Sequence, residues 1–119
     1  MRNITRRTRA EVYLLWLKKL RSGEYEQGTG RLRNGCRFCP FGVLCDLASK
    51  DGGPEWNGFE FMGQPDRLRR EVREFMGMTL AATKVLLNMN DIRGHSFNQI
   101  AEYIEFKIMP RALEKEPTP

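Results

Sequence analysis

The residues best suited to chemistry in this 119-residue chain are its three cysteines and its single histidine. Cys36, Cys39 and Cys45 lie close together in the sequence, and thiolates at such spacing can share one tetrahedral metal ion. His95 is the histidine that could act as a fourth ligand. A structural zinc site usually has two paired ligand sets, and the second pair is absent here. We therefore expect core thiols, no metal and no cofactor, with these four residues as the candidates if an ion were bound.

Cys39 suggests a second kind of chemistry, because it directly precedes a segment that can begin a helix at Pro40. The dipole of that helix could lower the pKa of the thiol, and His95 with Asp91 or Asn98 could complete a nucleophile and base arrangement. Spacing alone does not support this arrangement, since cysteines near helix starts are common and a lone histidine in a turn is usually solvated. The sequence therefore predicts a non-enzymatic protein, with a metal- or thiol-dependent enzyme as an alternative.

Positive charge is concentrated in the first third of the chain. The net charge is +5, but residues 1–40 hold ten Lys or Arg against three acids, which leaves a net −2 on the remaining 79 residues. Such asymmetry suits an anionic partner such as nucleic acid or an acidic protein face. The ordinary alternative is that the basic residues form a solvated rim that keeps a small protein soluble. The predicted partner-binding residues are Arg2, Arg6, Arg7, Arg9, Lys18, Lys19, Arg31, Arg33 and Arg37.

Nucleic acid is the alternative partner for these basic residues. Their segments lack interleaved aromatic residues, so we expect any binding to be to the phosphate backbone and independent of base sequence. Residues 94–101 are similar to the entry of a helix-turn-helix, but no recognition helix follows. Glu102 and Glu105 would moreover repel phosphate at that position. The final helix is therefore predicted to pack in the core.

Helices are predicted wherever capping residues precede apolar residues at helical spacing. We expect a first helix from about Arg9 to Arg21, capped by Thr8, and a short, deeply buried helix that begins at Pro40. A third helix is expected to begin at Pro65 and Asp66 and to end at Gly77. The last helix is expected to follow Ser96 and to end at Pro110. Residues 79–89 fit either a strand or a helix, and we favour a helix.

Asn34-Gly35 predicts a short hairpin, because this pair readily adopts the positive φ angles of a tight turn. Residues 55–63 are expected to form an irregular or hairpin stretch over the core. The fold prediction is a mainly α (α+β) domain of about four helices with a short β-hairpin. One globular domain is expected over residues 1–110, followed by a charged, Pro-containing tail over residues 111–119.

The composition and the lengths of the apolar stretches indicate where in the cell the protein is expected. Apolar residues make up 40% of the chain and charged residues 29%, which is enough to bury a core. No stretch approaches the roughly 20 apolar residues of a membrane-spanning helix, and the start of the chain lacks the apolar centre of a secretory signal. We therefore expect a cytoplasmic protein that has no membrane partner.

Three stretches resemble a family of small, largely uncharacterised proteins found in phage and prophage genomes. They are RSGEYEQGTGRLR at 21–33, FCPFGVLCDLA at 38–48 and SFNQIAEYIE at 96–105. The resemblance implies a location in the cytoplasm of a bacterial host or within a phage particle. The family brings no established activity, cofactor or catalytic residue that could be assigned to this chain. Small phage accessory proteins often act by binding during host takeover or as minor virion parts. We therefore predict binding of a host protein or a virion or assembly component, with the oligomeric state left open.

Overall fold

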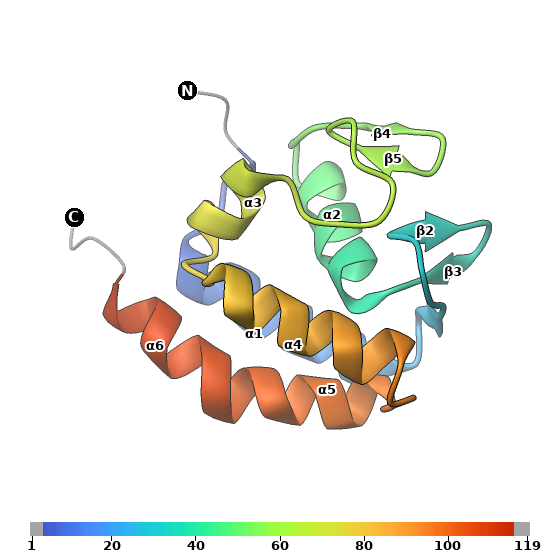
Figure 1. The fold of residues 1–119 in the computed structure, drawn as a ribbon. Helices are drawn as coiled ribbons and strands as arrows, with labels where there is room; N and C mark the ends of the chain where they lie inside the picture. The colour runs from blue at the N-terminus through green and yellow to red at the C-terminus, as the bar shows by residue number, and fades with distance from the viewer. Residues whose placement is uncertain (1–3, 116–119) are drawn as a thin grey trace.

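Helices form most of the regular backbone in the computed structural model, which describes residues 4–115 (Figure 1). They are α1 (Arg9–Ser22), α2 (Pro40–Lys50), α3 (Arg70–Phe75), α4 (Leu80–Asp91), α5 (Phe97–Tyr103), the π-helical segment η1 (Ile104–Ile108) and α6 (Met109–Glu114). The strands are short: β1 (Glu26–Gln27), β2 (Arg33–Asn34), β3 (Arg37–Phe38), β4 (Trp56–Asn57) and β5 (Glu60–Phe61). The predicted small, mainly helical α+β fold is confirmed.

α1 begins and ends where its capping residues predict. The Thr8 side chain accepts a hydrogen bond from the backbone N–H of Glu11, whose own side chain accepts one from the backbone N–H of Thr8. Gly23 ends the helix in the left-handed conformation, with a φ of 79°. The buried residues of α1 face several elements, and its Trp16 indole donates a hydrogen bond to the Pro40 carbonyl at 2.9 Å.

The predicted Asn34-Gly35 hairpin is confirmed as the turn between β2 and β3, and Gly35 has a φ of 64°. β2 pairs with β3 in antiparallel fashion, and β1 adds to the other edge of β3 in parallel, so the strand order is β1-β3-β2. β1 was not predicted, because two residues are too short to show a periodic pattern. A second antiparallel pair, β4 and β5, closes around Gly58, which has a φ of 62°.

α2 is the most buried helix, as predicted. Cys39 is its N-cap, Pro40 is its first residue, and every residue from Pro40 to Ala48 is buried. Gly42 makes this burial possible, because a Cβ atom there would lie 1.7 Å from the carbonyl oxygen of Leu32. The hairpin backbone therefore packs directly on the backbone of α2.

α3 begins later than predicted, at Arg70 instead of at Pro65 and Asp66. The carbonyl of Pro65 accepts a hydrogen bond from the Leu32 N–H at 2.8 Å, and Gln64 pairs with Phe61. These bonds hold the backbone before Arg70 against the hairpins, so it does not enter the helix. Residues 80–91 form the helix α4, which confirms the preference for a helix over a strand there.

The last helix does not close at Pro110, which corrects that prediction. It continues through η1 into α6, and Ala112 is buried beyond the proline. A proline inside an α-helix clashes with the carbonyl four residues earlier and lacks an N–H to donate. The wider π turn gives the ring room, and the Met109 N–H bonds to the Ile104 carbonyl five residues earlier. Helical backbone thus extends to Glu114, into the segment 111–119 that was predicted to be a tail. Residues 116–119 of that segment lie outside the described residues.

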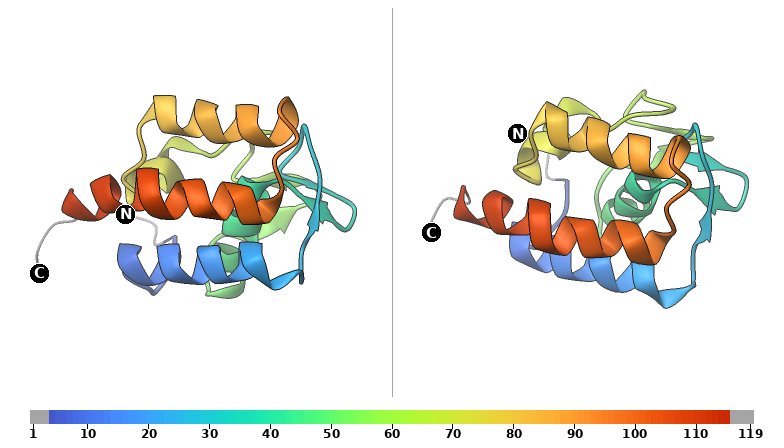
Figure 2. Two further views of the ribbon diagram at one scale, coloured as in Figure 1. Left: turned by 90° about the horizontal axis from the view of Figure 1, so that it is seen from below. Right: turned by 60° about the horizontal axis from the view of Figure 1, so that its bottom comes forward.

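The long helices lie side by side in one layer. Figure 2 shows α1, the helix α5–η1–α6 and α4 in parallel rows, with α2 and the two hairpins behind them. α1 contacts α2, α5 and α6, and α4 contacts α5, so the core lies between this layer and α2. Within residues 4–115, no helix combines the length and the apolar character that crossing a bilayer requires.

Candidate partner-binding surface

The nine basic residues predicted to bind a partner are dispersed over separate parts of the molecule. Arg2 lies outside the described residues. Arg6 and Arg7 lie in the segment before α1, which is attached to the C-terminal end of α2. The Arg6 backbone N–H donates to a carboxylate oxygen of Asp51 at 3.0 Å, and Arg7 Nε lies 3.7 Å from the other oxygen. These contacts fix the position of the segment and leave the Arg7 side chain partly exposed.

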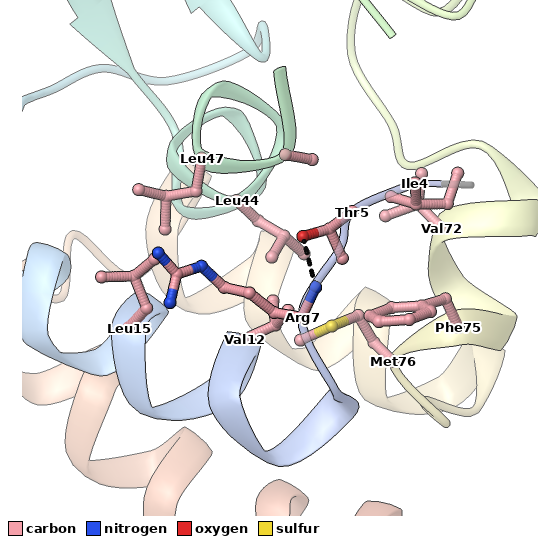
Figure 3. A pocket seen from close by; sticks show the side chains of 11 residues that line it. Ile4, Thr5, Arg7, Val12, Leu15, Leu44, Leu47, Val72, Phe75 and Met76 are labelled. Atoms are coloured by element: carbon pink, nitrogen blue, oxygen red, sulfur yellow. Dashed lines mark hydrogen bonds between the residues drawn. The ribbon is translucent and has the colours of Figure 1, made fainter. Parts of the chain in front are cut away.

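Figure 3 shows a small apolar pocket beneath this N-terminal segment. Ile4 covers it from one side, and aliphatic side chains of α1 and α2 together with Phe75 and Met76 form its walls. Its volume is about 10 Å³, which is no more than the space for one water molecule, and its lining is apolar. The pocket is therefore a packing gap in the core and is too small for a ligand.

Arg9 serves to hold three helices together. Its Nε and one terminal nitrogen donate to the carbonyls of Phe75 and Glu74 at the end of α3, at 2.5 and 3.2 Å. The other terminal nitrogen donates to the carbonyl of Ala112 in α6 at 2.9 Å. These carbonyls lie near helix C-termini, where a cation is favourable. The Arg9 guanidinium is thus turned toward its own chain.

Lys18 and Lys19 lie on α1, and the structure gives them different surroundings. Lys19 Nζ is 2.8 Å from a carboxylate oxygen of Glu24, so its charge is partly balanced. Lys18 is exposed and has no ion pair among residues 4–115. Of this pair, Lys18 therefore has the more accessible charge.

The hairpin arginines contact aromatic rings from a distant part of the chain. The guanidinium of Arg31 lies 4.6 Å from the ring centre of Phe59, and that of Arg33 lies 4.8 Å from Trp56. Both distances are within the range of cation–π attraction. The prediction that the basic residues lack interleaved aromatic residues is therefore wrong at this hairpin, because the fold brings the β4–β5 hairpin beside β2.

Arg37 points away from this cluster. In the register of β2 and β3, Arg33 pairs with Phe38, whereas Arg37 pairs with Asn34. Since paired residues share one face of a sheet and neighbours along a strand alternate, Arg33 and Arg37 lie on opposite faces. The three hairpin arginines therefore do not form one surface.

A third cation and a row of aromatic rings extend the cluster. Lys50 Nζ lies 5.6 Å from the ring centre of Tyr25. Phe38 lies edge-on between Tyr25 and Trp56, with ring centres 5.0 and 6.3 Å away. Cation–π pairs occur roughly once per 75 residues in proteins, so three adjacent pairs are a concentration. We call the following six residues the basic–aromatic surface: Tyr25, Arg31, Arg33, Lys50, Trp56 and Phe59.

Asp46 on α2 holds this surface in place from beneath. One carboxylate oxygen accepts a hydrogen bond from the Tyr25 hydroxyl at 2.6 Å and lies 3.1 Å from Lys50 Nζ, and the other accepts one from Trp56 Nε1 at 3.0 Å. Partial burial opposes ionisation of Asp46, but these donors outweigh it and lower its pKa. Burial, together with the hydrogen bond to Asp46, raises the pKa of Tyr25. Sequence reasoning missed Asp46, although an acid inside the apolar run FGVLCDLA was a usable signal.

The cysteines do not form the arrangement that a thiolate nucleophile needs. Cys39 and Cys45 are buried and Cys36 is exposed. Burial raises the pKa of the Cys39 thiol to about 12, which corrects the expectation that the helix dipole could lower it, and burial also raises the pKa of Cys45. Among residues 4–115, no group of three or more His, Cys, Asp and Glu side chains could hold a metal ion, so His95 and the cysteines are not brought together as ligands.

Comparison with known protein families places part of the chain in a described family. The model of a family described as "Domain of unknown function (DUF8296)" matches residues 8–74, which is more than half of the chain. All six residues of the basic–aromatic surface lie within this segment. No curated protein and no solved structure matches the chain.

Proposed function

We propose that this chain, which belongs to the family DUF8296, is a non-enzymatic, phage-type accessory protein that binds a macromolecular partner through the basic–aromatic surface. The partner class is a host protein or a virion or assembly component. The observation that carries the proposal is the set of three cation–π pairs formed by Arg31, Arg33 and Lys50. The phage-type part rests on the resemblance of residues 21–33, 38–48 and 96–105 to small phage proteins.

The composition of this surface favours a protein partner. Trp, Tyr, Phe and Arg are enriched at protein–protein interfaces, and Trp, Tyr and Arg dominate their hot spots. Phe59 is 41% exposed, and Arg31 beside it is also exposed. Tyr25 and Trp56 are half-buried and fixed by Asp46, so binding would cost little side-chain entropy. The surface is therefore a preorganised one.

A neighbouring acid argues against a phosphate backbone as the first choice. The Asp46 carboxylate lies 3.1 Å from Lys50 Nζ and balances part of the positive charge of this surface. A carboxylate in this position weakens the attraction for phosphate groups. Mixed charge of this kind instead suits a protein interface.

The test is an affinity pull-down with the tagged full chain from lysate of an infected bacterial host, with and without nuclease. We expect a stoichiometric protein that survives nuclease treatment. The Arg31→Glu/Arg33→Glu variant should lose this protein, because it reverses two of the three cations that lie over aromatic rings. Phe59→Ala should weaken its recovery.

The matched control is Arg70→Glu/Arg93→Glu, which makes the same charge change at two exposed positions outside the surface. This variant should recover the partner as the unmodified chain does. Thermal unfolding must show that all variants are folded. Equal recovery by the Arg31→Glu/Arg33→Glu variant would overturn the proposed surface.

Nucleic acid is the second candidate partner, favoured by the exposed Phe59 ring beside Arg31. Bases can stack on an aromatic ring or on a guanidinium plane without regard to sequence. This candidate predicts that recovery disappears with nuclease. It also predicts that binding of a single-stranded oligonucleotide weakens steeply as salt concentration rises, and that Phe59→Ala weakens it further.

A further inference from the structure

A second pocket lies between α4, the segment that precedes α3 and the turn at Gly30. Its volume is about 340 Å³, within the range of roughly 300–1,000 Å³ that is common for small-molecule sites. None of the six residues of the basic–aromatic surface lines it. The chain after β5, which forms one wall, crosses in front of α2 above α4 in Figure 1.

Apolar side chains form much of the lining. Phe41 from α2, Leu68, and Leu80 and Leu87 from α4 all contribute. Leu80 is 57% exposed, so the chain itself leaves much of this side chain uncovered. An apolar group in the pocket would remove this surface from water, which is favourable by about 25 cal/mol per Å².

Three cations also line the pocket: Arg67, Arg73 and Lys84. The side-chain ammonium group of Lys84 forms no hydrogen bond or ion pair with any residue among 4–115. Arg73 donates from one terminal nitrogen to the Met78 carbonyl at 3.3 Å, and its other N–H groups have no such partner within the described part of the chain. These donors are available to an anion.

Two acids in the lining, Asp66 and Asp91, offset part of this charge. The carboxylate of Asp66 lies 3.3 Å from Arg67 Nε. One oxygen of Asp91 accepts from the Gly30 N–H at 3.2 Å and from the side-chain nitrogen of Asn90 at 2.8 Å. With three cations and two carboxylates the lining has a net charge of +1, and its available side-chain donors are on Lys84 and Arg73.

We propose that this pocket binds a small carboxylate that carries an apolar body. The carboxylate accepts hydrogen bonds from Lys84 and Arg73, and the apolar body packs on Leu80 and Leu87. The proposal goes beyond macromolecular binding at the basic–aromatic surface, because it concerns a different set of residues and a different class of ligand.

The experiment is an NMR titration of the full ¹⁵N-labelled chain with hexanoate, followed through its backbone amide shifts. Hexanol has a similar apolar chain without the charge, and hexylammonium reverses the charge. We expect saturable shifts at Gly30, Lys84 and Leu87 with hexanoate, and much smaller ones with the other two compounds. Raising the salt concentration should weaken hexanoate binding.

Two lysine variants make the test specific. Lys84→Gln should weaken hexanoate binding about tenfold, a change equivalent to ~1.4 kcal/mol. Lys107→Gln, at an exposed lysine outside the pocket, should leave it unchanged. The proposal is overturned if hexanoate gives no saturable shifts, if hexanol shifts the same amides equally, or if Lys84→Gln binds as the unmodified chain does. Both lysines are exposed, so both variants should fold.

Discussion

Asp46 shows how one side chain can determine the geometry of a whole surface. Its two oxygens bind donors from three separate parts of the chain, at Tyr25, Lys50 and Trp56. Without this carboxylate the Tyr25 hydroxyl and the Trp56 N–H would lose their partner in a half-buried position, which is costly. Asp46 therefore supports both the fold and the proposed binding surface.

We predict that Asp46→Asn lowers the free energy of unfolding by about 1–3 kcal/mol at neutral pH, as expected when a charged hydrogen-bond acceptor is lost. Urea denaturation measures this change. Asp66→Asn, at an exposed acid that pairs with one arginine, should change stability by less than about 0.5 kcal/mol. Equal losses in both variants would contradict the role of Asp46.

The contribution of Asp46 should depend on pH with a definite sign. Its pKa in the folded chain is lowered from the ordinary 3.8, so the folded state favours the ionised form. The stabilisation is therefore complete above pH 3.8 and is lost as pH falls through the lower folded value. The stability difference between the unmodified chain and Asp46→Asn should accordingly shrink in acid. A difference that stays constant down to pH 2 would refute this linkage.

Gly42 is a position where no side chain fits. A Cβ atom would meet the Leu32 carbonyl oxygen at 1.7 Å, and both atoms belong to backbones that the core holds in place. We predict that Gly42→Ala lowers the free energy of unfolding by about 3 kcal/mol or more. Ser49→Ala on the same helix should change it by less than about 0.5 kcal/mol. Circular dichroism during urea denaturation would compare the two.

At the scale of elements, Arg9 joins α1 to the ends of α3 and α6. We predict that Arg9→Lys destabilises the fold by about 2 kcal/mol, because one ammonium group cannot replace three separately directed N–H donors. Hydrogen exchange should accelerate in α6 more than in α2. Arg70→Lys, at a mostly exposed arginine, should leave both rates unchanged. Uniform acceleration throughout the chain would show that Arg9 does not act on α6 in particular.

The sequence predicted those elements whose ends carry local signals. Capping boxes at Thr8 and Ser96 and the Asn34-Gly35 turn reside in a few neighbouring residues, and each is confirmed. The start of α3 and the course of the chain at Pro110 depend on contacts with distant residues or on a change of helix type. The residue pattern near these positions therefore does not predict such contacts.

The same distinction applies to the candidate surface. The concentration of arginines near the hairpin was visible in the sequence, but their aromatic partners lie more than twenty residues away, in β4 and its turn. The opposite orientation of Arg37 depends on the strand register, which a two-residue strand does not reveal. Which cations share a face could therefore be known only from the fold.

At the scale of the whole molecule, the cysteines report on global unfolding. Cys36 is exposed, whereas Cys39 and Cys45 lie in the core. We predict that a thiol reagent such as DTNB modifies one thiol in the native protein and all three in denaturant. Cys36→Ser should abolish the native signal. Rapid modification of a second thiol in that variant would contradict the burial of the other two.

The bond from Arg9 to the carbonyl of Ala112 connects two parts of the chain that differ in their relation to the family. Arg9 lies inside residues 8–74, which the family model matches, and Ala112 lies well beyond them. α1 also packs its buried side against α5 and α6. A chain ended at residue 74 would leave this side uncovered. The segment that the family model matches is thus shorter than the part of the chain that contributes to the core.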